Sequence, residues 1–384
     1  MFPRTSSFIL KPSSFILSPY MPGLYIHIPF CRRKCRYCDF TSLADRDELI
    51  TPYLEAVGIE AKRSKPLFGR PPDTLYIGGG TPSMLGPGQL EKLFSLTGVV
   101  FGPLKDFRES TFEVNPESLT PEKVSLLKTA GISRISLGLQ ASQDRLLNRL
   151  GRLASFQDFL AAFKTLRQAG FNNINIDLMT GLPDQSRDDF SAALKEILAL
   201  EPEHVSFYAL EIHEGTAFYA QGLREAPEAA ADMFESGSAA LEAAGFRHYE
   251  ISNFARPGRE SHHNLNYWDQ GDYLGLGAAA ASHRDGLRRG NTRDVELYIR
   301  TAGSPEGPEP EYSEILSPES RRTERIMLGL RKTAGIELPE DIFVEFRERI
   351  AGLSARGLLE VSGRRLKIKK EALYISNAVF REFV

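Results

Sequence analysis

The feature that most constrains the fold is a regular alternation of β-rich runs with amphipathic helical segments over the first 215 residues. Strands that alternate with helices pair in parallel through right-handed crossovers. Six candidate strands are too few for a complete eight-stranded barrel. We therefore expect an α/β fold with an incomplete (β/α)6 barrel of the TIM type. The candidate strands span residues 23–29, 74–80, 110–116, 134–140, 173–183 and 204–212.

Polar side chains and glycines gather toward the carboxyl ends of these strands. Parallel α/β sheets and barrels hold their sites at this edge, so we expect the functional site there. Taken singly, each residue has an ordinary explanation: a glycine run can be a turn, a carboxylate can be a paired structural charge, and a glutamine can cap a helix. Only their joint placement points to a site. These residues are Cys31, Gly80, Thr81, Glu113, Gln140 and Asp177.

All three cysteines lie within eight residues, as Cys31-x3-Cys35-x2-Cys38. An odd number packed this tightly excludes a disulfide framework and indicates a reducing compartment. A structural zinc site usually takes four ligands, so His27 would have to complete it. An iron–sulfur cluster is held by thiolates, and three thiolates on four irons leave one iron open. The basic residues within and beside the loop favour ionised sulfur.

The CxxxCxxC spacing, with Tyr37 directly before the third cysteine, resembles the signature of the radical SAM superfamily. In that superfamily the open iron of a 4Fe-4S cluster chelates the amino and carboxylate groups of S-adenosylmethionine (SAM). The resemblance therefore implies a cluster on Cys31, Cys35 and Cys38 with SAM at the open iron.

Further motifs occur in the order YIHIPFCRRKCRYCDF, YIGGGTPS, FEVNPESL, RISLGLQ, NIDLMTGLP, FYALEI, YEISNFARPG and HNLNYW. This set resembles the oxygen-independent coproporphyrinogen III oxidase family of porphyrin biosynthesis. The chemistry is compatible, because glycines let backbone approach a ligand, carboxylates accept from ribose hydroxyls, and arginine pairs with a carboxylate. The resemblance implies SAM contacts by Tyr25, Gly80, Thr81, Glu113, Gln140, Arg152 and Asp177, with Tyr37 packing beside SAM.

Two subfamilies share these motifs: the oxidase, which decarboxylates two propionates of its substrate, and a heme chaperone subfamily named HemW. The oxidase pattern has a fourth cysteine where this chain has Phe40. The chaperone pattern HNxxYW is present as residues 263–268, which include the only tryptophan. The resemblance thus implies a chaperone that binds heme, a 4Fe-4S cluster and SAM, and transfers heme to an acceptor protein. The alternative is the oxidase.

The HNLNYW motif supplies candidate heme contacts. An imidazole can ligate heme iron axially, and aromatic rings can pack on the porphyrin. From the residues alone, a hydrogen-bonded loop histidine beside a core tryptophan is the commoner explanation. The resemblance favours heme contacts by His263, Tyr267 and Trp268, with His262 as an adjacent alternative ligand.

The chain departs from the family pattern at two positions. Ala154 and Ala281 stand where relatives often carry histidine, and His283 follows the second of them closely. The sequence does not show how these changes affect binding.

Composition and linkers predict the domain organisation. Residues 1–20 form an expected disordered extension, 21–215 the partial barrel, 216–302 a heme- or substrate-binding region, and 303–384 a C-terminal winged-helix-like α/β module. A net charge of -3 offers no basic field for nucleic acid. No long apolar run occurs, so we expect a cytoplasmic protein. Resemblance suggests a membrane respiratory enzyme as heme acceptor, and no motif identifies an electron donor.

Overall fold

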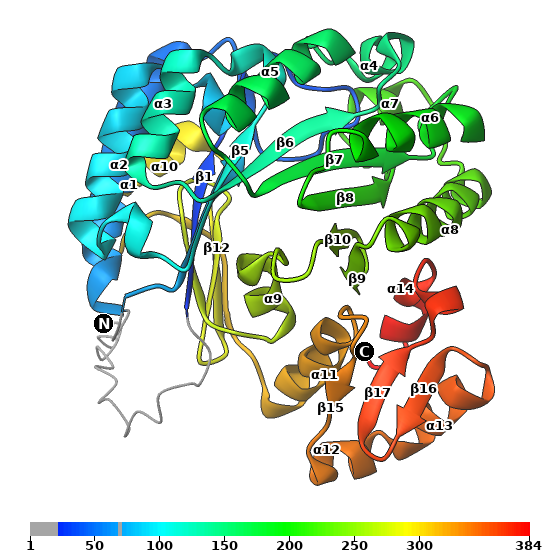
Figure 1. Ribbon diagram of the computed structural model, residues 1–384. Helices are drawn as coiled ribbons and strands as arrows, with labels where there is room; N and C mark the ends of the chain where they lie inside the picture. Colours follow the sequence, from blue (N-terminus) through cyan, green and yellow to red (C-terminus); the bar gives the residue numbers. More distant parts are fainter. Residues whose placement is uncertain (1–21, 68–70) are drawn as a thin grey trace, which may run out of the picture.

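The structure is a computed structural model that describes residues 22–67 and 71–384, so the predicted extension over 1–20 lies outside the described residues. Six parallel strands form the centre of a curved sheet in the order β1-β4-β5-β6-β7-β8 (Figure 1). The expected incomplete barrel is confirmed, and each strand begins within one residue of its predicted start. The strands are β1 (Gly23–Ile28), β4 (Thr74–Gly79), β5 (Glu109–Val114), β6 (Arg134–Gln140), β7 (Ile174–Thr180) and β8 (His204–Ala209).

Helices connect these strands and cover one face of the sheet (Figure 1). Local sequence sets their ends: Thr120 accepts a hydrogen bond from the Lys123 amide at the start of α3, and Gly131 ends that helix at φ +98°. Helix α5 buries Phe159, Phe163 and Leu166 on one face, as its apolar spacing requires. The connecting helices are α1 (Ile50–Ser64), α2 (Pro87–Phe101), α3 (Pro121–Ala130), α4 (Asp144–Leu150), α5 (Phe156–Gln168) and α6 (Arg187–Leu198).

Short strands extend the sheet at both edges beyond the six that the sequence indicated. Beside β1 runs β11, which is parallel to it, followed by antiparallel β12, β13 and β14. At the other edge, β10 and β9 are antiparallel. The added strands are β9 (Arg247–Glu250), β10 (Asn253–Ala255), β11 (Tyr273–Leu276), β12 (Ala281–Arg284), β13 (Leu287–Asn291) and β14 (Pro310–Ile315), with helices α7 (Ala217–Ala220), α8 (Pro227–Ala243), α9 (His262–Trp268) and α10 (Val295–Thr301).

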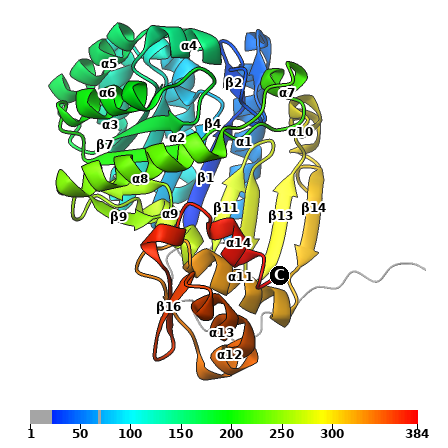
Figure 2. The same ribbon diagram turned by 90° about the vertical axis from the view of Figure 1, so that its right-hand side faces the viewer.

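A smaller unit follows β14 and packs below the open side of the main sheet (Figure 2). It combines helices with a three-stranded antiparallel sheet in the order β15-β17-β16, as the winged-helix-like prediction expects. The Ile251 amide donates to the Arg331 carbonyl, and the Thr333 amide to the Tyr249 carbonyl, which ties the unit to the barrel. Its elements are α11 (Pro318–Gly329), β15 (Ile336–Glu337), α12 (Glu340–Glu345), α13 (Arg347–Ala355), β16 (Leu359–Ser362), β17 (Arg365–Ile368) and α14 (Ser376–Phe380).

The predicted domain boundary at residue 303 remains a prediction. Strand β14 lies on the C-terminal side of that boundary, yet it pairs with β13 in the large sheet. Within residues 22–67 and 71–384, the helices are all too short or too polar to cross a membrane.

Candidate functional site: a cysteine-lined cavity beside an aromatic cavity

The cysteine loop is held at both ends by backbone pairing. Strand β2 (Phe30–Cys31) pairs in parallel with β3 (Leu43–Ala44), which closes the loop. At the middle of the loop, the Arg36 amide donates to the Leu150 carbonyl at 2.9 Å. Cys31 is buried, Cys35 and Cys38 are half-buried, and all three thiols are free. The loop therefore presents three unpaired sulfurs from a fixed backbone.

The glycine run at the end of β4 lies directly against this loop. The Gly80 amide donates to the Ile28 carbonyl at 2.9 Å, and the Thr81 amide donates to the Phe30 carbonyl at 2.8 Å. A Cβ atom at Gly80 would lie 2.8 Å from the Phe30 carbonyl oxygen and 3.0 Å from the Cys31 sulfur. Both approaches are too close for a side chain, so only glycine fits between β4 and Cys31.

Three cysteines and seven of the eight residues predicted to contact SAM line one cavity of about 590 Å³. Arg33 and Lys34 add positive charge at its wall. The exception is Tyr25, which lines a neighbouring cavity. The structure thus brings together residues from five strand ends and the cysteine loop. The predicted residues in this cavity are Cys31, Cys35, Tyr37, Cys38, Gly80, Thr81, Glu113, Gln140, Arg152 and Asp177.

Two of the carboxyl groups that line the cavity, those of Glu113 and Asp177, resist ionisation. The Tyr76 hydroxyl donates to Glu113 Oε1 at 2.7 Å, and the Gly79 amide donates to Oε2 at 3.0 Å. Burial raises the pKa of Glu113 to about 7, and the nearby charge of Asp177 adds to this rise. Burial also raises the pKa of Asp177, although the Asn175 side chain donates to it at 2.7 Å. Such perturbed carboxyl groups are typical of functional sites.

A chain of hydrogen bonds links Arg152 to the cysteine loop. The Arg152 guanidinium donates to the Asn115 side-chain oxygen at 3.1 Å and to the Gly138 carbonyl at 2.9 Å. The side-chain amide of Asn115 donates to Thr81 Oγ1 at 3.0 Å, and the Thr81 hydroxyl donates to the Cys31 sulfur at 3.4 Å. The buried arginine therefore has a fixed position beside the sulfurs and can pair with an anionic group there.

Gln140 adopts an unusual backbone conformation at the wall of the cavity. Its φ is +76°, a region that non-glycine residues rarely occupy. The Tyr208 hydroxyl donates to its side-chain oxygen at 3.2 Å. Strained residues of this kind cluster at ligand sites, because the surrounding structure must hold them in place.

The donor set fits a cluster with an open coordination position. Three sulfurs share the cavity with polar groups, among them Thr81 and Arg152. Burial raises the pKa of Cys31, and burial raises the pKa of Cys38 to about 11. Without metal these thiols keep their protons, so the expectation that the basic residues of the loop keep the sulfurs ionised is wrong for Cys31 and Cys38, where burial outweighs the nearby positive charge. A metal centre must displace these protons when it binds.

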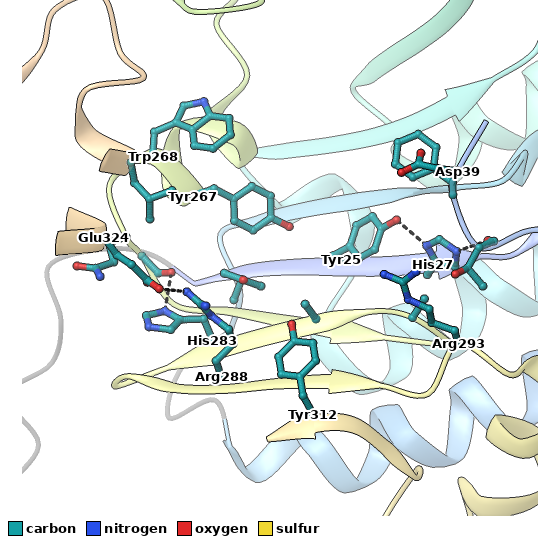
Figure 3. A pocket seen from close by; sticks show the side chains of 18 residues that line it. Tyr25, His27, Asp39, Tyr267, Trp268, His283, Arg288, Arg293, Tyr312 and Glu324 are labelled. Carbon is teal, nitrogen blue, oxygen red and sulfur yellow. Dashed lines mark hydrogen bonds and ion pairs between the residues drawn. The ribbon is translucent and has the colours of Figure 1, made fainter. Parts of the chain in front are cut away.

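Figure 3 shows a second cavity, of about 740 Å³, which shares two lining residues with the first. Asp39 and Phe40, which directly follow the third cysteine, line both cavities. The second cavity lies against β1, the added strands β11 to β14, and the end of α9. Its wall combines aromatic rings, imidazoles, arginines and two carboxylates, and includes Tyr25, His27, Asp39, Tyr267, Trp268, Tyr273, His283, Arg288, Arg293, Tyr312 and Glu324.

The three predicted heme residues divide between this cavity and the core. Tyr267 and Trp268 line the cavity, and the Arg331 guanidinium lies 4.2 Å from the centre of the Trp268 ring. His263 is buried and lines neither cavity. Its Nδ1 is 2.8 Å from the Thr74 hydroxyl, and its Nε2 is 2.9 Å from the Tyr267 hydroxyl. Burial lowers the pKa of His263 to about 3, so the ring is neutral.

Comparison with known proteins identifies the family. Residues 25–197 match the Radical SAM superfamily, and residues 316–375 match the HemN C-terminal domain. The heme chaperone HemW of Bacillus subtilis (strain 168) is 36% identical over 379 residues, which cover 95% of this chain and 99% of that relative. The chain belongs to the HemW family.

Two further comparisons agree with the assignment of this chain to the HemW family. The heme chaperone HemW of Escherichia coli (strain K12) is 39% identical over 265 residues, covering 67% of this chain and 69% of the relative. Among solved structures, the coproporphyrinogen III oxidase HemN of Escherichia coli, a radical SAM enzyme, superposes with a TM-score of 0.83 at 25% identity. That match covers 95% of this chain and 91% of HemN. The predicted family and fold are confirmed.

Sequence reasoning missed the residues that complete the second cavity. Tyr273, Arg288 and Tyr312 come from strands that carry no clear alternating pattern, and His283 was noticed only as a neighbour of Ala281. A usable signal was the concentration of aromatic and basic residues between 267 and 312.

Proposed function

We propose that this protein is a heme chaperone that carries a 4Fe-4S cluster on Cys31, Cys35 and Cys38 and binds SAM beside it. Heme would occupy the separate aromatic cavity and pass from there to an acceptor protein. One observation carries the proposal: the cysteines and all predicted SAM residues except Tyr25 line one cavity, and a second cavity of ligand size adjoins it. Ligand cavities commonly measure about 300–1,000 Å³.

The cysteine cavity offers a partner for each polar part of SAM. When bound, the cluster would supply an iron with an open coordination position for the amino acid end. Arg152 would pair with the carboxylate, because its guanidinium is held beside the cysteine loop by Asn115 and the Gly138 carbonyl. Glu113 and Asp177 would accept hydrogen bonds from the ribose hydroxyls. Tyr37 would pack beside SAM.

The aromatic cavity suits a flat, mostly apolar ligand with anionic ends. Tyr25, Tyr267 and Trp268 offer ring faces and edges for packing on a porphyrin, and Arg293 offers a cation for a propionate. The predicted axial ligation by His263 has a structural cost. Its two ring nitrogens would first have to leave Thr74 and Tyr267. In the observed arrangement, His263 instead positions the Tyr267 hydroxyl.

The alternative function is oxidative decarboxylation of coproporphyrinogen III, because HemN shares the whole fold. Phe40, which occupies the place of the oxidase's fourth cysteine, is exposed and lies between the two cavities. An anaerobic assay for vinyl product under reducing conditions distinguishes the two functions. The chaperone proposal predicts no product, and product formation would overturn it.

The heme acceptor is the expected partner, since the relatives are named heme chaperones. We propose a cytoplasmic protein that delivers heme to another protein, with a membrane respiratory enzyme as the candidate suggested by resemblance. The electron donor is unidentified, and the charge of the chain gives no reason to expect nucleic acid.

The proposal is tested by anaerobic reconstitution with iron and sulfide, followed by separate titrations with SAM and heme. Wild-type protein should take up four irons per chain, bind SAM only when the cluster is present, and develop a heme Soret band. Cys35→Ser should lose the cluster and SAM binding but retain heme, because the cavities are separate. Ser95→Ala, at an exposed residue of α2 that lines neither cavity, is the control. Failure of the wild-type protein to bind heme would contradict the chaperone function.

A further inference from the structure

We propose that His283, rather than the motif histidine His263, is the axial heme ligand of this protein. The inference rests on the proposed function, since it assumes that heme occupies the aromatic cavity. It concerns a residue that the HNLNYW motif does not include.

His283 is placed on the cavity wall by strand β12. Alternate residues of a strand share one face, and Ala281 and His283 both line the aromatic cavity. The His283 side chain is 10% exposed, and its ring centre lies 6.0 Å from that of Tyr273 on the paired strand β11. The imidazole is therefore nine-tenths buried at the wall of a ligand-sized cavity.

The surroundings of the ring leave one nitrogen available. Nδ1 lies 3.4 Å from the Gly271 carbonyl oxygen and 3.9 Å from Asp272 Oδ1. Both are acceptors, so they favour the tautomer with the proton on Nδ1. Nε2 is buried and has no hydrogen-bond partner among the described residues. Buried polar atoms normally have partners, so this one calls for a ligand.

This arrangement is the usual one for a metal-binding histidine. Such a ring donates one N–H to a carbonyl or carboxylate, which fixes the tautomer and leaves the other nitrogen's lone pair for the metal. Binding would be dative: Nε2 gives its lone pair to the heme iron, and Nδ1 keeps its proton. The step requires no oxidant, reductant or proton acceptor.

The other histidines near the cavity lack a free nitrogen. His27 lines the cavity, but its Nδ1 is 2.8 Å from the Tyr25 hydroxyl and its Nε2 is 2.9 Å from the Thr41 carbonyl. The two ring nitrogens of His263 are likewise engaged, with Thr74 and Tyr267. Among these three imidazoles, only His283 can ligate a metal without first breaking a hydrogen bond.

The rest of the cavity fits a heme ligated at this end. Figure 3 shows His283 and Arg293 at opposite ends, with Tyr25, Tyr267 and Tyr312 between them. Arg293 is exposed, and no ion pair of its guanidinium is found in the described part of the chain. It can therefore meet a propionate at the open end while the aromatic rings contact the porphyrin.

The test is heme titration of the full-length protein, followed by absorption and electron paramagnetic resonance of the ferric complex. His283→Ala should weaken heme binding by about 10- to 100-fold or more, because even residues that merely support metal ligands have effects of this size. Its ferric spectrum should change, and added imidazole should restore it. His248→Gln, at a half-buried histidine on β9 that lines neither cavity, is the matched control and should behave as wild type.

The outcomes separate this inference from the proposed function. If wild type binds heme and His283→Ala binds it with unchanged affinity and spectrum, the ligand assignment is wrong and the chaperone function stands. If His263→Gln, rather than His283→Ala, loses the axial-ligand spectrum, the motif histidine is the ligand. Circular dichroism and SAM binding of His283→Ala report whether the variant is folded. His283→Cys provides a second variant, because a thiolate ligand should produce a different ferric spectrum.

Discussion

Glu113 should make the stability of the cofactor-free protein fall as pH rises. Burial raises the pKa of this carboxyl group from 4.5 to about 7. At about 1.4 kcal/mol per pH unit, that rise corresponds to about 3 kcal/mol. Below pH 4.5 the Glu113 carboxyl group is protonated in both the folded and the unfolded chain, so its full contribution of about 3 kcal/mol to the free energy of unfolding is present. Between pH 4.5 and 7 the Glu113 carboxyl group ionises only in the unfolded chain. This ionisation favours unfolding, so the contribution to stability is lost over that range.

The Glu113→Gln variant removes this dependence. Glutamine has one acceptor oxygen where the carboxyl group serves both Tyr76 and the Gly79 amide, so the variant loses one hydrogen bond. This loss costs about 1–3 kcal/mol and does not itself change with pH. The informative quantity is therefore the change with pH, measured by urea unfolding of cofactor-free protein between pH 5 and 8. Wild type should lose about 2.5 kcal/mol more than the variant over this interval, because part of the contribution is already lost at pH 5.

A control substitution distinguishes this local effect from general charge effects. Glu91 is an exposed glutamate on α2, and Glu91→Gln should keep the pH dependence of wild type. If Glu113→Gln and wild type lose stability in parallel as pH rises, then Glu113 is not a buried protonated carboxyl group. The electrostatic description of the cavity would then be wrong.

Four further predictions concern the cluster loop and the aromatic cavity. Gly80→Ala should abolish cluster incorporation and leave the secondary structure intact, because the added Cβ would lie 2.8 Å from the Phe30 carbonyl oxygen. Iron content measures the first effect and circular dichroism the second. Full iron loading of the variant would refute the steric argument. Cluster assembly should become more favourable as pH rises from 6 to 9. Burial raises the pKa of the Cys38 thiol to about 11, and its proton must leave when the cluster binds. Competition with an iron chelator across this pH range measures the trend, and an affinity that does not change with pH would contradict it. Heme should quench tryptophan fluorescence strongly, because Trp268 is the only tryptophan and lines the aromatic cavity; unquenched emission with heme bound would place heme elsewhere. Arg331→Ala should change the emission of the heme-free protein, because it removes the cation over that ring.

The sequence predicted the centre of the fold well because its strands are long, apolar and separated by helices of regular period. The added strands were not predictable in the same way. Strand β12, with the sequence ASHR, has four residues and no apolar alternation, and β10 has three residues. Such strands form because neighbouring strands already offer free edges, which is tertiary information. The barrel core and its extensions thus differ in how much local sequence determines them.

The same distinction applies to the site residues. The cysteine spacing and the strand-end positions indicated one cavity, because parallel strands bring their carboxyl ends together. Which histidine has a free nitrogen depends on contacts between distant segments. Thr74 and His263 are 189 residues apart, yet their side chains are 2.8 Å from one another. A motif shows that a histidine is present, and only the folded chain shows whether its lone pair is available.

The central claim is that cluster-bound SAM and heme occupy two adjoining but separate cavities. The most direct test is a heme titration of anaerobically reconstituted protein saturated with SAM, with the stoichiometry of both ligands measured on the same sample. Separate cavities predict one heme and one SAM bound together on each chain. Displacement of SAM by heme, in equal amounts, would show that the two ligands share one cavity and would contradict this account.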